Sequence, residues 1–178
     1  MAALAEQKPF DAESLLGATL TTKQGIRPTN EVLKGKKYLA IYFSAHWCPP
    51  CRQFTPLLAE VYDTVKANDD DDLEVVFVSS DRSKGEFDEY YGSHPWTAVP
   101  FEARGVKSEL SATFGVSGIP TLVVVSLADG MVKDAGARST VMKYKGDTVE
   151  LLKYWDGCAG MAVGKRPGAE FATGCAVM

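Results

Sequence analysis

Two cysteines separated by two residues, Cys48 and Cys51, have the type and spacing of a redox-active pair. A thiolate attacks a disulfide to form a mixed disulfide, and a second thiol close by resolves it by closing a disulfide within the protein. We therefore expect Cys48 to be the nucleophile and Cys51 the resolving thiol. Their own reversible disulfide would carry the electrons, so we expect no cofactor.

The two residues between the cysteines are Pro49 and Pro50, neither of which has an amide hydrogen. The dipole and free amides of a helix that begins here would stabilise the thiolate of Cys48. Since the first amide hydrogen beyond Cys48 is that of Cys51, this stabilisation is limited. We predict a moderately lowered pKa of Cys48, which favours reductase over oxidase behaviour.

The segments on either side of the pair predict a strand and a helix. Residues 36–43 end in a continuous apolar run, which is typical of a strand buried on both faces. Residues 51–65 have apolar side chains at intervals of three and four, which predict an amphipathic helix kinked at Pro56. The other elements that we predict are a hairpin at 19–27, strands at 73–79, 121–127 and 131–133, and helices at 84–93, 108–114 and 148–155.

The composition is that of a globular protein, with 46% hydrophobic and 24% charged residues. The net charge of −4 argues against nucleic acid as a partner. We see no signal-peptide pattern and no apolar run of transmembrane length, so we expect a cytoplasmic or nuclear protein. We expect a lead-in over residues 1–18, an α/β domain over 19–156, and a flexible tail rich in glycine and alanine over 157–178.

A structural zinc module is the alternative use of a cysteine pair. Zinc requires two further ligands, and the candidates are poorly placed, because His46 is too near in sequence and Cys158 and Cys175 are distant. We therefore favour the redox interpretation and expect no metal. His46 could stabilise the Cys48 thiolate when charged, although an exposed loop histidine is the simpler interpretation.

Three segments, in order along the chain, resemble the thioredoxin superfamily and, within it, the tryparedoxin/nucleoredoxin branch. They are FSAHWCPPCR at 43–52, PWTAVPF at 95–101 after a pair of tyrosines, and FGVSGIPT at 114–121. The resemblance implies a thioredoxin fold, in which a central mixed β-sheet is flanked by helices. It implies a protein-disulfide reductase whose partners are disulfide-containing client proteins and an upstream reductant, either thioredoxin reductase, glutathione or trypanothione. A redox-sensing adaptor of nucleoredoxin type is the alternative.

The same resemblance implies the surroundings of the dithiol. Pro120 would follow a cis peptide bond and lie beside Cys48, and Ile119 would present its backbone to the partner's chain. The other residues implied to line the site are Trp47, Pro49, Pro50, Trp96 and Arg138.

Two positions depart from related proteins. Ordinary thioredoxins carry a buried aspartate six residues before the first cysteine, where this chain has Tyr42. The branch lacks this aspartate too, and the general base for Cys51 stays unassigned. Ser80 stands where some tryparedoxins have a tryptophan, which weakens the case for a surface specific for trypanothione.

The last four residues, Cys175-Ala176-Val177-Met178, match a C-a-a-X box whose final methionine favours farnesyl. We expect Cys175 to be prenylated and the protein to associate peripherally with a membrane. One lipid chain binds weakly, and Cys158 is a candidate for a second.

Overall fold

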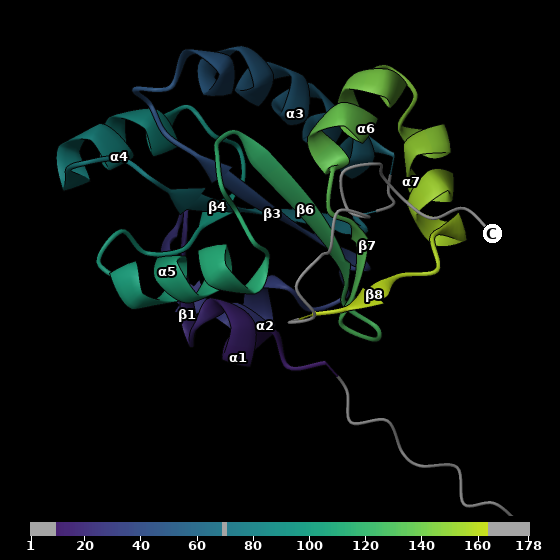
Figure 1. Cartoon of the computed structure of the whole chain (residues 1–178), viewed down its shortest axis with the longest axis horizontal. Helices are drawn as coiled ribbons and strands as arrows, with labels where there is room; N and C mark the ends of the chain where they lie inside the picture. The colour runs from purple at the N-terminus through teal and green to yellow at the C-terminus, as the bar shows by residue number, and fades with distance from the viewer. Residues whose placement is uncertain (1–9, 69–70, 164–178) are drawn as a thin grey trace, which may run out of the picture.

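An eight-stranded mixed β-sheet is the centre of the computed structural model, which describes residues 10–68 and 71–163 (Figure 1). The strand order is β2-β1-β5-β4-β3-β6-β7-β8. Strands β3, β4 and β5 are parallel, whereas β6 pairs antiparallel with β3 and begins an antiparallel run through β7 to β8. The strands are β1 (Thr19–Thr22), β2 (Gly25–Pro28), β3 (Tyr38–Ser44), β4 (Leu73–Ser79), β5 (Thr97–Ala98), β6 (Thr121–Ser126), β7 (Met131–Asp134) and β8 (Met161–Ala162).

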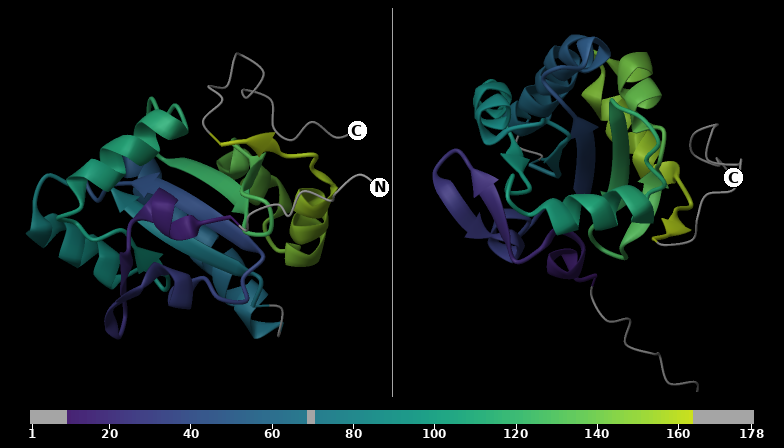
Figure 2. Two further views of the ribbon diagram at one scale, coloured as in Figure 1. Left: turned by 90° about the horizontal axis from the view of Figure 1, so that it is seen from below. Right: turned by 60° about the vertical axis from the view of Figure 1, so that its left-hand side comes forward.

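Helices cover both faces of this sheet (Figures 1 and 2). On one face lie α3 (Pro49–Ala67), α4 (Lys84–Gly92), α6 (Ala137–Tyr144) and α7 (Thr148–Gly157). On the other lie α1 (Ala12–Leu16), α2 (Thr29–Val32) and α5 (Arg104–Thr113). Within the described ranges, no helix is both long and apolar enough to cross a bilayer. The thioredoxin fold, with a mixed sheet flanked by helices, is confirmed.

Strand β3 lies between β4 and β6 in the middle of the sheet, and it is buried on both faces because helices cover each side. Its alternate side chains divide between two cores, as the twofold period of a strand requires. Ala40 and Tyr42 pack under α3, whereas Ile41 and Phe43 pack toward α1 and α5. This burial fixes the register of β3, and with it the point at which the chain leaves the sheet at Ser44.

Several predicted elements match closely. Strand β4 has the predicted bounds, and α4 begins at the predicted residue, where Ser83 Oγ caps the helix by accepting from the amide of Glu86 at 3.2 Å. Helix α3 continues through Pro56 as one element. Helix α5 begins at Arg104, four residues before the predicted start.

Other elements fall outside the predictions. Helix α1 lies in the segment expected to be a lead-in, where Ala12 and Leu16 bury their side chains in the second core. Strand β8 lies in the segment expected to be a tail. It forms because Met161 pairs with Val132 at the edge of the sheet. Residues 164–178 of the predicted tail, including the C-a-a-X box at Cys175, lie outside the described residues. Cys158 is buried, with 3% of its surface exposed.

Candidate active site

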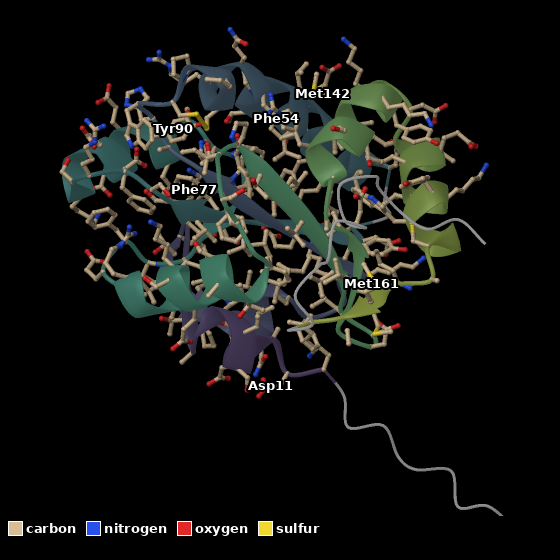
Figure 3. All side chains as sticks on the ribbon, in the orientation of Figure 1. Asp11, Phe54, Phe77, Tyr90, Met142 and Met161 are labelled. Atoms are coloured by element: carbon tan, nitrogen blue, oxygen red, sulfur yellow. A yellow bond between two sulfur atoms is a disulfide. The ribbon has the colours of Figure 1, made fainter. Side chains whose placement is uncertain are left out.

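The cysteine pair lies where β3 gives way to α3, and Cys48 and Cys51 form a disulfide (Figure 3). Cys48 is the N-cap residue, in extended conformation, and Pro49 and Pro50 occupy the first turn, where a missing amide hydrogen removes no helical bond. Cys48 is 5% exposed and Cys51 is fully buried. The sulfur that a partner can reach is therefore that of Cys48, as expected for the nucleophile.

A loop from a distant part of the chain completes this surface. The Ile119–Pro120 peptide bond is cis, which confirms the prediction. The carbonyl oxygen of Ile119 lies 3.8 Å from Cys48 Sγ, and its side chain packs against the small cluster of Ala45, Cys48 and Cys51. The backbone of Ile119 is thus beside the reactive sulfur, where an extended partner chain could pair with it.

The loop that leads into the pair is held by hydrogen bonds to the end of β4. The buried carboxylate of Asp81 accepts from the amide of His46 at 2.7 Å. Trp47, 44% exposed, donates from its indole nitrogen to the carbonyl oxygen of Ser80 at 3.0 Å. The ring of Trp47 therefore stands fixed beside the dithiol with one face in contact with solvent, as a substrate-contacting residue requires.

Four hydroxyl groups form a buried cluster beneath Cys51, which we call the hydroxyl cluster: Tyr42, Ser44, Thr55 and Tyr90. Thr55 Oγ1 donates to the carbonyl oxygen of Cys51 at 2.9 Å. It lies 2.8 Å from the hydroxyl of Tyr42 and 2.6 Å from that of Tyr90, which is 3.0 Å from Ser44 Oγ. Burial raises the pKa of Tyr42, so the residue that replaces the aspartate of thioredoxins stays neutral.

Sequence reasoning missed most of this cluster. Thr55 stands four residues after Cys51, the spacing at which a helical threonine bonds a backbone carbonyl, and this was the available sequence pattern. Ser44 and Tyr90 come from the end of β3 and from α4, and only the folded chain brings them together. The same holds for Asp81, which follows β4.

Trp96 and Arg138, which were also expected to line the dithiol, contact other aromatic side chains on this face of the sheet. Trp96 is 1% exposed, and its ring stands edge-on to Tyr42 and Tyr62, inside the core under α3. It also lines a pocket of about 390 Å³ shared with Glu74, near the start of β4 and so at the far end of the sheet from the dithiol. Arg138 lies on α6, with its guanidinium 6.0 Å from the ring of Phe54.

The surroundings of the pair do not suit zinc. In residues 10–68 and 71–163, no three His, Cys, Asp or Glu side chains converge as metal ligands. The backbone of His46 is bonded to Asp81, and its ring stacks on Tyr90 at 5.4 Å. The zinc alternative therefore has no ligand set in this part of the chain.

Comparison with known proteins agrees with the site. The model of the thioredoxin-like family matches residues 35–132. Tryparedoxin of Trypanosoma brucei brucei is 44% identical over 136 residues, which span 74% of this chain and 90% of that protein. Nucleoredoxin of Danio rerio is 40% identical over 129 residues, which span 72% of this chain and only 30% of the longer protein.

Solved structures give the same result. Tryparedoxin from Trypanosoma brucei superposes with a TM-score of 0.67 at 42% identity, covering 74% of this chain and 90% of that one. Tryparedoxin II in complex with glutathionylspermidine superposes with a TM-score of 0.65 at 36% identity, covering 71% and 85%. The family match, these relatives and the Cys48–Cys51 pair lead to one conclusion: the chain belongs to the thioredoxin-like family and is a thiol-disulfide oxidoreductase.

Proposed function

We propose that this protein reduces the disulfides of client proteins through Cys48 and Cys51. The observation that carries the proposal is the placement of the two cysteines, since Cys48 lies at a helix N-cap beside the carbonyl oxygen of Ile119 with 5% of its surface exposed, and Cys51 is fully buried. A partner can therefore reach the first sulfur, while the second is held where it can attack the first.

The reaction then proceeds in two exchanges. The Cys48 thiolate attacks one sulfur of the client disulfide, forms a mixed disulfide and releases the other client sulfur as a thiolate, which takes up a proton. The Cys51 thiol loses its proton and attacks Cys48 Sγ, which closes the Cys48–Cys51 disulfide and releases the second client thiolate. The client gains two electrons, and the protein gives up two until a reductant restores its dithiol.

The hydroxyl cluster holds Cys51 for the second step. It bonds the carbonyl oxygen of Cys51 and brings no buried negative charge near a sulfur that must become a thiolate. Because a nearby negative charge would disfavour that thiolate further, a neutral cluster adds no charge repulsion to the cost that burial already imposes. The proton of Cys51 would pass to water or to the departing client thiolate.

Insulin reduction driven by dithiothreitol tests this proposal. Wild type should accelerate the precipitation of insulin B chain. Cys48→Ser should abolish turnover, and Cys51→Ser should also lose it while accumulating a mixed disulfide visible in non-reducing gels. Full turnover by Cys48→Ser would reject the proposal.

The reductant that restores the dithiol is part of the proposal. A tryparedoxin has been captured with glutathionylspermidine, which supports a low-molecular-weight thiol, such as glutathione or trypanothione, over a reductase enzyme such as thioredoxin reductase. Following reduction of the Cys48–Cys51 disulfide with each of the three reductants, at matched concentrations, ranks them. Faster reduction by thioredoxin reductase than by either glutathione or trypanothione would contradict the proposal of a low-molecular-weight thiol.

The second candidate function is a redox-sensing adaptor, which the similarity to nucleoredoxin favours. Such a protein would hold its partner without turnover. Partner binding that persists in Cys48→Ser would support the adaptor, and binding that requires Cys48 would support the reductase.

We also propose that Cys175 is farnesylated and tethers a cytoplasmic protein to a membrane. The C-a-a-X match at residues 175–178 is the support. Mass spectrometry of native protein should show loss of the last three residues and a farnesyl group on Cys175. An unmodified terminus at Met178 would contradict this proposal.

A further inference from the structure

A pocket of about 220 Å³ lies between the first turns of α3 and the end of α4, and two of its lining residues, His46 and Arg52, flank the cysteine pair in the sequence. We call it the Arg52 pocket. Its lining residues are His46, Arg52, Thr55, Pro56, Tyr90 and Ser93. These described residues include a guanidinium, an imidazole and three hydroxyls, but no acid. Arg52 directly follows Cys51, and its amide bonds the carbonyl oxygen of Cys48 at 3.1 Å, so its side chain starts from the same turn of α3 as the dithiol.

The hydroxyls of the pocket are already engaged with the protein. Thr55 and Tyr90 belong to the hydroxyl cluster, and Ser93 Oγ donates to the carbonyl oxygen of Tyr90 at 2.8 Å. The guanidinium of Arg52 and the ring nitrogens of His46, by contrast, have no hydrogen bond or ion pair among residues 10–68 and 71–163. Arg52 is exposed. The hydrogen-bond donors available to a bound ligand are therefore the permanently charged guanidinium of Arg52 and the imidazole of His46.

The nearest acid that the hydrogen bonds identify does not neutralise this pocket. Asp81 is 5% exposed, and its carboxylate accepts from the His46 amide and from Ser79 Oγ. Its charge also acts on Arg104, whose pKa it raises against the lowering effect of burial. The Arg52 pocket is thus a positive site in a chain whose net charge is −4.

We propose that the Arg52 pocket binds a carboxylate that flanks the disulfide of the partner, so that this protein prefers acidic disulfide substrates. The inference rests on the proposed function and names its substrate class. A partner chain that lies along Ile119, with its sulfur at Cys48, has neighbouring side chains directed to either side of the dithiol. Pro49 and Pro50 are exposed but have no amide hydrogens, so Arg52 is the charged donor of the first turn.

Three disulfide peptides that differ only beside the cysteine, with Glu, Ala or Lys there, test the preference. The measurement is kcat/KM for their reduction by the full chain at low salt. A partly exposed ion pair contributes about 1 kcal/mol, so the Glu peptide should exceed the Lys peptide by about fivefold. The preference should shrink in 0.5 M salt, because exposed charges are screened.

Arg52→Gln should bring the Glu and Lys peptides within about twofold of each other, and Arg52→Glu should reverse their order. The Ala peptide should change little, which separates a lost subsite from a general loss of Cys48 reactivity. Arg52→Lys should keep the preference. Lys66→Gln is the matched control, because it removes the same charge from the other end of α3.

Two results would overturn the inference. One is an unchanged preference in Arg52→Gln, and the other is an equal loss for all three peptides. Either leaves the proposed function intact so long as the Ala peptide is reduced by wild type and not by Cys48→Ser. Circular dichroism of each variant confirms that the helix is intact.

Discussion

Two buried polar clusters lie at opposite ends of strands β3 and β4, and they differ in charge. The hydroxyl cluster lies beneath the dithiol and holds only neutral groups. At the far end, the 3% exposed carboxylate of Glu74 accepts from the hydroxyls of Tyr62 and Thr97 at 3.3 Å. The ring of Trp96 stands between them, 6.0 Å from Tyr42 and 5.8 Å from Tyr62.

The difference shows how this chain uses buried charge. A carboxylate beneath the dithiol would oppose a thiolate, and this chain has Tyr42 in that place. Among its buried acids, Glu74 stands at the start of β4, where Lys66 and Lys36 partly offset the burial that raises its pKa. Asp81 follows the end of β4 and accepts from the amide of His46. The cluster directly beneath Cys51 is therefore neutral, whereas the cluster at the far end holds a carboxylate.

The largest loss of stability should come from removing the indole ring of Trp96, which lies between the two clusters. Trp96→Ala would leave a cavity beside both tyrosines and lower the free energy of unfolding by about 3–5 kcal/mol. Chemical denaturation measures this. Trp47→Ala is the matched control, because its 44% exposed ring should contribute under about 1 kcal/mol while client reduction falls. Equal destabilisation by the two substitutions would contradict the assignment of Trp96 to the core.

His94 lies against Trp96, with ring centres 5.0 Å apart, and should make stability depend on acidity. Burial, with a contribution from Lys23, lowers the pKa of His94 to about 3 from 6.5. Below pH 6.5 His94 binds a proton in the unfolded chain but stays neutral in the folded chain until the pH approaches 3. The free energy of unfolding therefore falls as the pH falls from 6.5 toward 3. The loss at pH 4.5 should be about 2 kcal/mol. In His94→Phe the free energy of unfolding should no longer show this loss between pH 6.5 and 4.5. An unchanged dependence on pH would contradict the assignment of the loss to His94.

Thr55→Val removes the group that joins the hydroxyl cluster to Cys51 at nearly constant volume. It leaves the hydroxyls of Tyr42 and Tyr90 without their shared partner and should lower stability by about 1–2 kcal/mol. The matched control is Thr64→Val, since Thr64 makes the same bond to the carbonyl four residues earlier but on the exposed side of α3. Similar losses of stability in the two variants would show that the hydroxyl cluster does not stabilise the fold.

Glu74→Gln should have the smallest effect at neutral pH. Because burial raises the pKa of Glu74, wild type gains stability as the pH falls through that pKa, and the variant should lack this gain. At pH 7 the two proteins should differ by about 1 kcal/mol or less. If Glu74→Gln lost several kcal/mol of stability at pH 7, the ionised carboxylate would be needed for folding. That result would contradict the view that the buried charge at this end is only tolerated.

Most of the dithiol end could be predicted from sequence. The strand and helix around Cys48 and Cys51 have long, regular apolar patterns, and the cis peptide bond before Pro120 followed from the resemblance. Helix α1 and strand β8 could not be predicted, since α1 has five residues and β8 two, too few to show a period. Trp96 was expected at the dithiol because the resemblance implied it, yet its side chain is buried in the core, with 1% of its surface exposed.

The most direct test of the account is the relative reactivity of the two thiols. Fully reduced protein would be treated briefly with iodoacetamide at near-neutral pH, and each cysteine quantified by mass spectrometry. Cys48, partly exposed at the N-cap of α3, should be alkylated at least tenfold faster than the fully buried Cys51. Equal rates, or faster alkylation of Cys51, would contradict the assignment of Cys48 as the nucleophile.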